Sequence, residues 1–265
     1  MDLKNKTIVI TGASGGIGEA IAEQLSVLGA NLILVGRNTE KMSRFNQQQS
    51  NRHQIVGADL SRQTDRDLLF KVCQDSHSID ILINAAGISN FSSFSDTSEE
   101  LLTRLMNINL ISPMMLTNQL LPLLSQSSKS IILNVGSTFG GIGYPGFSQY
   151  CASKFGLRGF SESLKRELQD TSTKVLYIAP RATNTKINSN SVVQLNQDLG
   201  TKTDDPKFVA TVVIKQLINE TDRVAIGWPE KLFLKINGLF PGLVDNAIAK
   251  QLKQIKKFTS LKHHI

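Results

Sequence analysis

The fold of this chain is decided by one stretch near its beginning, Thr7-Ile8-Val9-Ile10-Thr11-Gly12-Ala13-Ser14-Gly15-Gly16-Ile17-Gly18. An apolar strand-like run leads directly into a glycine-rich turn, and an amphipathic helical pattern follows over residues 16–29. Glycines let the backbone turn sharply and approach a pyrophosphate, and the helix N-terminus adds free N–H groups and partial positive charge. Because the turn lies between the first strand and the first helix, it predicts a dinucleotide site rather than a simple turn. The predicted contacts are Gly12, Ser14, Gly15, Gly16, Ile17 and Gly18.

Short apolar runs alternate with longer amphipathic stretches along the rest of the chain. The runs are continuous in apolar character, as expected of strands whose two faces are both covered by helices. This alternation predicts an α/β fold with a parallel, doubly wound sheet. The predicted strands span residues 7–11, 32–35, 54–57, 79–84, 130–135, 174–178 and 223–226. The predicted helices span roughly residues 16–29, 38–48, 63–75, 98–124, 149–169 and 206–219.

The length of 265 residues fits one domain better than two, and no repeat or linker divides the chain. We predict that residues 1–228 form the dinucleotide-binding domain with its catalytic site. Residues 229–265 are then a basic, amphipathic helical extension of the same domain. The polar segment 181–205 is too long for a tight connection, which indicates a functional lid.

The composition, with 40% hydrophobic and 19% charged residues, is typical of a globular protein. No apolar run reaches 18 residues, so we expect no membrane-spanning helix. The N-terminus leads straight into a strand without the apolar core of a signal peptide. Cys73 and Cys151 are too few for a disulfide framework and are expected to be reduced thiols in a cytoplasmic protein. No metal site is predicted.

The net charge of +7 is concentrated at the C-terminus, where residues 231–265 hold seven lysines and one acid. Such a tail can bind an anionic lipid, an acidic carrier protein or nucleic acid, or can be a solvated helix face. Within it, one helical stripe is apolar and most lysines lie off it; the stripe consists of Val244, Ile248, Leu252 and Ile255. We favour packing of this stripe on the domain or on another subunit. The alternative is peripheral contact with the inner membrane surface through residues 243–258. We expect no nucleic-acid partner.

The end of the second predicted strand bears on the choice of cofactor. Enzymes that use NAD usually place an acid there to accept the ribose 2′-hydroxyl. This chain has Gly36-Arg37-Asn38 instead, and the first acid is Glu40. Because a guanidinium suits charge-assisted bonding to a 2′-phosphate, Arg37 favours NADP(H). The competing interpretation is a solvated loop arginine.

Asp59 and Leu60 follow the third predicted strand. In that position Asp59 can cap the adenine amino group of the cofactor. It can equally be a helix N-cap, and the sequence leaves both interpretations open.

Tyr150 and Lys154 stand four residues apart at the start of a predicted helix, so their side chains share one face. A free tyrosine has a pKa of about 10, and a nearby ammonium is expected to lower it. Tyr150 is therefore a candidate general acid/base that exchanges a proton with an alkoxide or alcohol. Ser137 follows the fifth strand at the carboxyl end of the sheet, where its hydroxyl can hydrogen-bond a substrate oxygen.

Together these features resemble the short-chain dehydrogenase/reductase family over roughly residues 5–228. The matching positions, in the family's order and spacing, are Thr11-Gly12-x-x-x-Gly16-x-Gly18, Asp59, Asn84-Ala85-Ala86-Gly87, Asn109, Ser137, Tyr150 and Lys154. The resemblance implies a single-domain Rossmann fold with a seven-stranded parallel sheet. It also implies a nicotinamide cofactor, exchange between a carbonyl and an alcohol, and a homodimer or homotetramer.

The resemblance assigns further residues to the site. The segment Asn84-Ala85-Ala86-Gly87 is similar to the one that steadies the central sheet and lies along the cofactor in the family. Asn109 is similar to the residue that holds a water in a proton relay behind Lys154. Both Tyr150 and Lys154 are also expected to contact the cofactor, Lys154 at the nicotinamide ribose.

One departure from the family lies after the sixth strand, in Pro180-Arg181-Ala182-Thr183-Asn184-Thr185. The family commonly has Pro-Gly before a threonine that contacts the nicotinamide amide, and Thr185 occupies that threonine's place. Pro180, Thr183 and Thr185 are therefore predicted cofactor contacts. Arg181 replaces the flexible glycine; it stiffens the lid, meets an anionic substrate group, or is simply exposed.

The segments expected to cover the substrate are rich in aromatic residues, namely Phe91, Phe94 and the stretch 139–147. Such a pocket suits a hydrophobic ketone, aldehyde or 3-oxoacyl thioester, although some of these aromatics can instead belong to the core. A rival interpretation is a catalytically silent NADP(H)-sensing protein on the same fold. Because such a protein has no need of Asn109, Ser137, Tyr150 and Lys154 together, we favour the enzyme.

Overall fold

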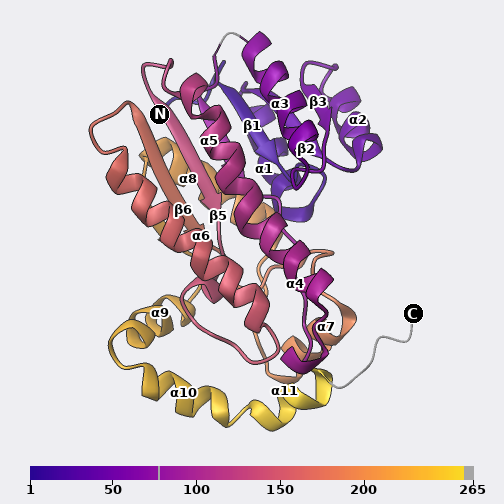
Figure 1. Cartoon of the computed structure of the whole chain (residues 1–265), viewed down its shortest axis with the longest axis vertical. Helices are drawn as coiled ribbons and strands as arrows, with labels where there is room; N and C mark the ends of the chain where they lie inside the picture. The colour runs from indigo at the N-terminus through magenta and orange to yellow at the C-terminus, as the bar shows by residue number, and fades with distance from the viewer. Residues whose placement is uncertain (77, 260–265) are drawn as a thin grey trace.

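The computed structural model describes residues 1–76 and 78–259, which form a seven-stranded sheet flanked by helices (Figure 1). All neighbouring strands are parallel, and their spatial order is β3-β2-β1-β4-β5-β6-β7. The predicted α/β fold with a doubly wound parallel sheet is thereby confirmed. The strands are β1 (Thr7–Thr11), β2 (Asn31–Gly36), β3 (Gln54–Gly57), β4 (Ile81–Asn84), β5 (Ser130–Val135), β6 (Thr173–Ala179) and β7 (Arg223–Ala225).

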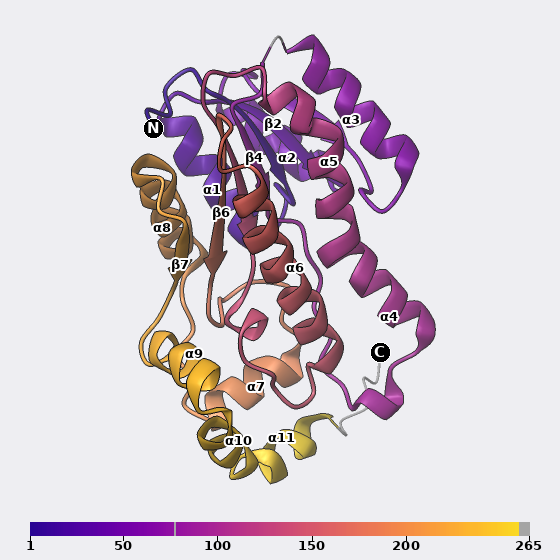
Figure 2. The same ribbon diagram turned by 60° about the vertical axis from the view of Figure 1, so that its left-hand side comes forward.

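Helices cover both faces of the sheet (Figures 1 and 2). One apolar core lies between the sheet and α1, α2 and α8, and a second lies between the sheet and α3, α5 and α6. The helices are α1 (Gly16–Val27), α2 (Thr39–Gln48), α3 (Gln63–Asp75), α4 (Glu99–Met106), α5 (Ser112–Leu124), α6 (Ser148–Glu167), α7 (Asn190–Asp198), α8 (Pro206–Asn219), α9 (Glu230–Leu239), α10 (Pro241–Ala249) and α11 (Leu252–Thr259).

Successive residues of each central strand point to opposite faces, and both faces are apolar. In β1, Ile8 and Ile10 belong to the core beneath α1 and α8, whereas Val9 belongs to the core beneath α3 and α5. All three side chains are fully buried. The continuous apolar runs in the sequence therefore reflect burial on both sides, as predicted.

Several predicted elements are shorter or more divided than the sequence indicated. The strand expected over 79–84 begins only at Ile81, because the Asp80 carboxylate accepts hydrogen bonds from the Thr7 amide (2.9 Å) and the Lys6 ammonium (2.8 Å). The helix expected over 98–124 is divided into α4, a π-helical turn at Asn107–Ile111, and α5.

Two further differences concern the carboxyl end of the sheet. The predicted lid, residues 181–205, contains the helix α7, which the sequence analysis did not predict. The helical stripe predicted over 244–258 is interrupted by a turn at residues 250–251, which separates α10 from α11. Residues 260–265, the end of the predicted basic extension, lie outside the described residues.

The C-terminal helices pack against this end of the molecule, away from the N-terminus (Figure 2). Ile255 and Phe258 of α11 join a cluster with Phe91, Phe147 and Leu195, the last of these from α7. Self-packing of the apolar stripe, the interpretation we favoured, is thus observed for Ile255.

Both cysteines are buried free thiols, as predicted. Among residues 1–76 and 78–259, no helix is both long enough and apolar enough to span a bilayer.

Replacing Ile255 by Ala should detach α11 from the cluster under the lid. Ile255 is fully buried, and such truncations cost about 2–5 kcal/mol in a well-packed core. Because α11 lies near the end of the chain, we expect local opening rather than global unfolding. Hydrogen exchange of residues 252–259 should accelerate in Ile255→Ala and stay unchanged in the control Lys253→Ala. Equal protection in the two variants would contradict the observed packing.

Candidate active site

The glycine-rich turn forms one wall of a cavity of about 510 Å³ at the carboxyl ends of β1, β2 and β4. Gly12 has a φ of +68°, and a Cβ added there would lie 2.8 Å from Ala86 Cα. A Cβ added at Gly18 would lie 2.3 Å from the Gly12 carbonyl oxygen. Side chains at these positions would therefore fill the space between the turn and its neighbours. The glycine-rich turn therefore leaves room for the close approach of a pyrophosphate, as the sequence predicted.

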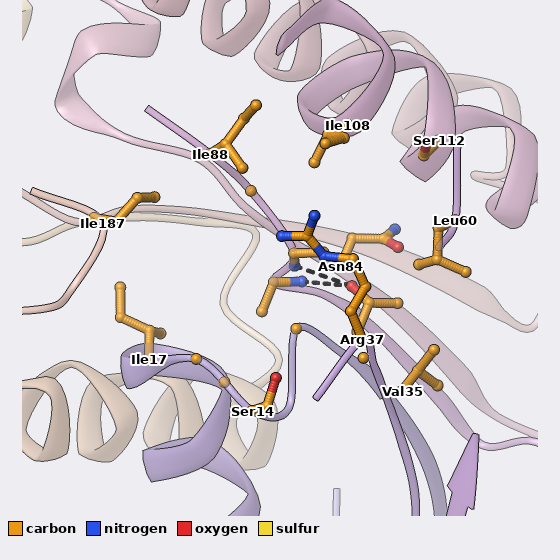
Figure 3. A pocket seen from close by; sticks show the side chains of 18 of the residues that line it. Ser14, Ile17, Val35, Arg37, Leu60, Asn84, Ile88, Ile108, Ser112 and Ile187 are labelled. Carbon is orange, nitrogen blue, oxygen red and sulfur yellow. Dashed lines mark hydrogen bonds between the residues drawn. The ribbon is translucent and has the colours of Figure 1, made fainter. Parts of the chain in front are cut away.

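The opposite wall of this cavity is fixed by hydrogen bonds from the end of β1 (Figure 3). Thr11 Oγ1 accepts hydrogen bonds from the amides of Ala85 (3.0 Å) and Ala86 (3.1 Å). Asn84 Nδ2 donates to Asn134 Oδ1 at 2.8 Å and Asn134 Nδ2 donates to Ser161 Oγ at 2.8 Å, so β4, β5 and α6 are joined. The segment predicted to steady the central sheet makes the corresponding contacts here.

Arg37 extends from the end of β2 into the same cavity (Figure 3). It is exposed, and its positive charge contributes to the lowering of the Asp59 pKa, which is chiefly due to a hydrogen bond from the Ser61 hydroxyl. The Asp59 carboxylate accepts that bond at 2.7 Å and a second from the Ser61 amide at 3.1 Å. The helix N-cap interpretation of Asp59 is wrong, because Arg62 occupies the N-cap of α3.

The structure gathers the predicted cofactor residues around two adjoining cavities. Lining the nucleotide cavity are Gly12, Ser14, Gly15, Gly16, Ile17, Gly18, Arg37, Asp59, Leu60, Asn84, Ala85, Gly87 and Thr185. Lining a second cavity of about 720 Å³ are Tyr150, Lys154, Pro180 and Thr183. Ile17, Ala85, Gly87 and Thr185 line both cavities, so the two spaces meet.

Tyr150 and Lys154, from the first turns of α6, face the second cavity together with Ser137. Lys154 Nζ lies 5.8 Å from the centroid of the Tyr150 ring and donates a hydrogen bond to the Val135 carbonyl at 3.0 Å. This bond anchors the ammonium to the end of β5. The shared helix face predicted from the spacing of four is confirmed.

The protonation of this pair differs from the expectation based on sequence. Burial raises the pKa of Tyr150, and the neighbouring Ser137 hydroxyl acts in the opposite direction. Burial also lowers the pKa of Lys154, to about 8. The prediction that the Lys154 ammonium lowers the pKa of Tyr150 was wrong. Removal from water disfavours both the phenolate of Tyr150 and the ammonium of Lys154.

A tyrosine that the sequence analysis missed lies behind Ser137. Tyr177, on β6, places its hydroxyl 3.4 Å from the Ser137 carbonyl oxygen and 3.5 Å from the Ser137 amide nitrogen. A Cβ added at Gly136 would lie 2.1 Å from that hydroxyl, so a side chain there would displace the Tyr177 ring. The Ser137 hydroxyl itself accepts a hydrogen bond from the Phe139 amide at 3.1 Å. The alternation of side chains along β6 places residue 177 on the same side of the sheet as α6, but no sequence pattern indicates its contact with Ser137.

Asn109 lies in the π-helical turn and is fully buried. Its Nδ2 donates to the Ile88 carbonyl (2.9 Å) and to Ser153 Oγ (3.1 Å), and its Oδ1 accepts from the Ile88 amide (2.8 Å). The Asn109 side chain therefore links the loop that follows β4 to α6, at the residue next to Lys154. The water relay implied by the resemblance stays a prediction. Turns with π-helical bonding are frequent at functional sites.

Arg181 is not simply exposed, because two carboxylates of the protein itself bind its guanidinium. Its Nε and Nη2 donate to the two Asp204 oxygens at 3.0 and 2.8 Å, and its Nη1 lies 3.3 Å from Glu230 Oε2. The Arg181 side chain is 13% exposed. Asp204 lies at the far end of the lid and Glu230 begins α9. The interpretation that Arg181 stiffens the lid is therefore supported.

The second cavity has mainly apolar walls. Phe139, Tyr144 and Phe147 line it, as predicted for the stretch 139–147. The predictions for Phe91 and Phe94 were wrong, since Phe91 belongs to the buried cluster and Phe94 is 61% exposed on a short 3₁₀ helix. Further lining residues, which the sequence did not indicate, come from the lid, from the segment before α9 and from α9 and α10; they are Val192, Leu195, Trp228, Phe233, Val244 and Ile248. Helical periodicity in those segments is the signal that was available.

At the carboxyl end of the parallel sheet, a glycine-lined crevice meets a cavity lined by the half-buried Tyr150 and the buried Lys154, an arrangement that defines a Rossmann-like α/β protein. The family model described as short chain dehydrogenase matches residues 6–196. The chain belongs to the short-chain dehydrogenase/reductase family, a family of oxidoreductases.

Known proteins resemble this chain at both the sequence and the structural level. An uncharacterized oxidoreductase of Staphylococcus epidermidis is 35% identical over 179 residues, which is 67% of this chain and 78% of the relative. A 3-oxoacyl-[acyl-carrier-protein] reductase of Rickettsia conorii is 34% identical over 181 residues, or 68% and 73% of the two chains. The crystal structure of a short-chain dehydrogenase from Streptomyces avermitilis has a TM-score of 0.80 at 26% identity, covering 94% of this chain and 96% of that one.

Removing the Arg181 side chain should release the lid. In Arg181→Ala the nearly buried Asp204 carboxylate loses its partner, and breaking such a pair costs about 3–5 kcal/mol. We expect faster hydrogen exchange in residues 182–204 and a lower Tm. The double variant Arg181→Ala/Asp204→Ala leaves no orphaned carboxylate at 204 and should recover part of the loss. Unchanged hydrogen exchange of residues 182–204 in Arg181→Ala would show that the ion pair does not hold the lid.

Proposed function

We propose that this protein is an NADP(H)-dependent oxidoreductase that interconverts a carbonyl and an alcohol on a hydrophobic substrate. The observation that carries the proposal is the junction of the two cavities. Ile17, Ala85, Gly87 and Thr185 line both, and Tyr150 lies in the second. A dinucleotide on the glycine-rich turn can therefore reach the cavity where a substrate oxygen meets Tyr150.

The nicotinamide, when bound, supplies or accepts the hydride. The chain's own residues manage the oxygen of the substrate. The raised pKa of Tyr150 keeps its hydroxyl protonated, so it can donate a proton to an oxygen that gains negative charge. Ser137, on the same cavity wall, is suited to hydrogen-bond that oxygen. Lys154, anchored to the Val135 carbonyl, places a positive charge beside the tyrosine ring.

Arg37 supports the choice of NADP(H) over NAD(H). Its guanidinium lies in the nucleotide cavity at the end of β2, where enzymes that use NAD carry an acid. An exposed guanidinium can form charge-assisted hydrogen bonds with both oxygens of a 2′-phosphate.

The cavity walls support a hydrophobic substrate. The rings of Phe139, Tyr144 and Phe147 pack against one another around the cavity, with centroids 5.1–6.4 Å apart. At about 720 Å³ the space accommodates an extended acyl or ring system. The similarity to a 3-oxoacyl-[acyl-carrier-protein] reductase makes acyl thioesters the first substrates to test.

Replacing Tyr150 by Phe should remove the proton donor while leaving the cofactor site intact. Loss of a general acid typically lowers kcat about 10²- to 10⁴-fold. The measurement is NADPH oxidation with carbonyl substrates of graded chain length, alongside NADPH binding by fluorescence. Tyr144→Phe, which changes a hydroxyl at the rim of the same cavity, is the matched control and should keep most activity. If wild-type protein binds NADPH but reduces none of the substrates, the silent nucleotide-sensing interpretation replaces the enzyme.

Replacing Arg37 by Ser should weaken NADPH selectively. A hydrogen bond to a charged group contributes about 1.5–3 kcal/mol, so the KM for NADPH should rise about ten- to hundredfold while that for NADH changes little. Arg44→Ser, on the exposed face of α2, is the matched control. A wild-type preference for NADH, or equal effects of Arg37→Ser on both cofactors, would refute the role of Arg37.

A further inference from the structure

The hairpin of α9 and α10 carries large apolar side chains on its outer side. Leu239, Phe240 and Leu243, at the turn between the two helices, are 73%, 61% and 63% exposed. We call these three residues the apolar elbow. Every residue of α9 is at least partly exposed, and Leu232 extends the apolar surface toward the start of this helix. Clusters of exposed apolar side chains of this kind mark contact surfaces.

Lysines surround the apolar elbow. Residues 229–259 contain six lysines and two acids, and one of the acids, Glu230, already pairs with Arg181. All six lysines have exposed side chains; they are Lys231, Lys235, Lys250, Lys253, Lys256 and Lys257. An apolar surface within a basic border matches a membrane with anionic headgroups, because apolar residues enter the interface while lysines stay at headgroup level.

The surface differs from the one that the sequence indicated. The predicted stripe faces inward, since Val244 and Ile255 are buried and Ile248 lines the substrate cavity. The apolar elbow lies on the other side of the same helices. One wall, made of α9 and α10, therefore separates the cavity from the outer apolar surface, with Phe233 and Val244 on its inner side.

The charge distribution argues against a second copy of the chain as the occupant. In a two-fold symmetric dimer the same patch would face itself. Such an interface would bring the lysine-rich borders of both copies together, and like charges in contact are unfavourable. An anionic lipid surface satisfies both the apolar elbow and its border.

We propose that the α9–α10 hairpin docks this protein on anionic membrane surfaces. The apolar elbow inserts at the level of the headgroups, and the surrounding lysines pair with lipid phosphates. Docking places the wall of the substrate cavity against the bilayer. The docking itself does not depend on the proposed reaction, so it can fail or succeed independently of it.

The test is cosedimentation of the full chain with two kinds of vesicle, phosphatidylcholine alone and phosphatidylcholine mixed with phosphatidylglycerol. Wild-type protein should bind the mixed vesicles, with affinity that falls as salt rises. The triple variant Leu239→Ser/Phe240→Ser/Leu243→Ser should lose tenfold or more, because each side chain contributes burial of apolar area. Lys231→Gln/Lys235→Gln should lose about fivefold for each lysine removed.

The matched control removes three apolar side chains that are exposed elsewhere, in Val27→Ser/Leu68→Ser/Phe208→Ser, and should bind like wild type. Circular dichroism and Tm establish that each variant is folded. Absence of binding to the mixed vesicles, or equal binding by wild type and the elbow variant, would overturn the proposal. So would a change in sedimentation coefficient of the elbow variant without vesicles, since the patch would then be a subunit interface.

Discussion

The site depends on how closely the carboxyl ends of β1 and β4 approach each other. Thr11 Oγ1 receives two backbone amides from the segment after β4, and Gly12 leaves no room for a side chain against Ala86. In the sheet order these two strands are neighbours, and the chain turns away from them in opposite directions. A crevice must open at this point in a doubly wound sheet. The glycine-rich turn therefore occupies the one edge position where a bound dinucleotide can meet both halves of the sheet.

Much of this arrangement follows from local sequence. Continuous apolar runs predict strands covered on both faces, and their alternation with amphipathic stretches leaves a parallel sheet as the outcome. The residues predicted for the nucleotide site lie just after the ends of strands or at the start of α1. Because the carboxyl ends of parallel strands meet at one edge of the sheet, the fold brings these residues together. Tyr150 and Lys154 share a face for the same reason, since helical periodicity fixes their relative position.

The features of the fold and site that the sequence did not predict depend on contacts between segments that are distant in the sequence. The division of residues 98–124 by a π-helical turn accompanies the contacts of Asn109 with Ile88 and Ser153, which lie on other elements. Arg181 had three open interpretations because neither Asp204 nor Glu230 is near it in the sequence. The direction of the shift in the Tyr150 pKa also depends on burial, which the spacing between Tyr150 and Lys154 does not reveal.

The partial removal of Tyr150 and Lys154 from water has a consequence for the direction of the proposed reaction. Removal from water favours the neutral phenol and lowers the pKa of the ammonium, so each group is shifted toward its uncharged form. A neutral phenol is ready to donate a proton but is a poor acceptor. In the proposed reaction, these protonation states would favour proton donation to a carbonyl oxygen over proton removal from an alcohol. In the oxidative direction, a positive charge brought by the oxidised nicotinamide would act in the same low-dielectric space and favour the phenolate. In the proposed reaction, proton transfer at Tyr150 would thus be coupled by electrostatics to the charge of the bound nicotinamide, because charges interact more strongly where little water surrounds them.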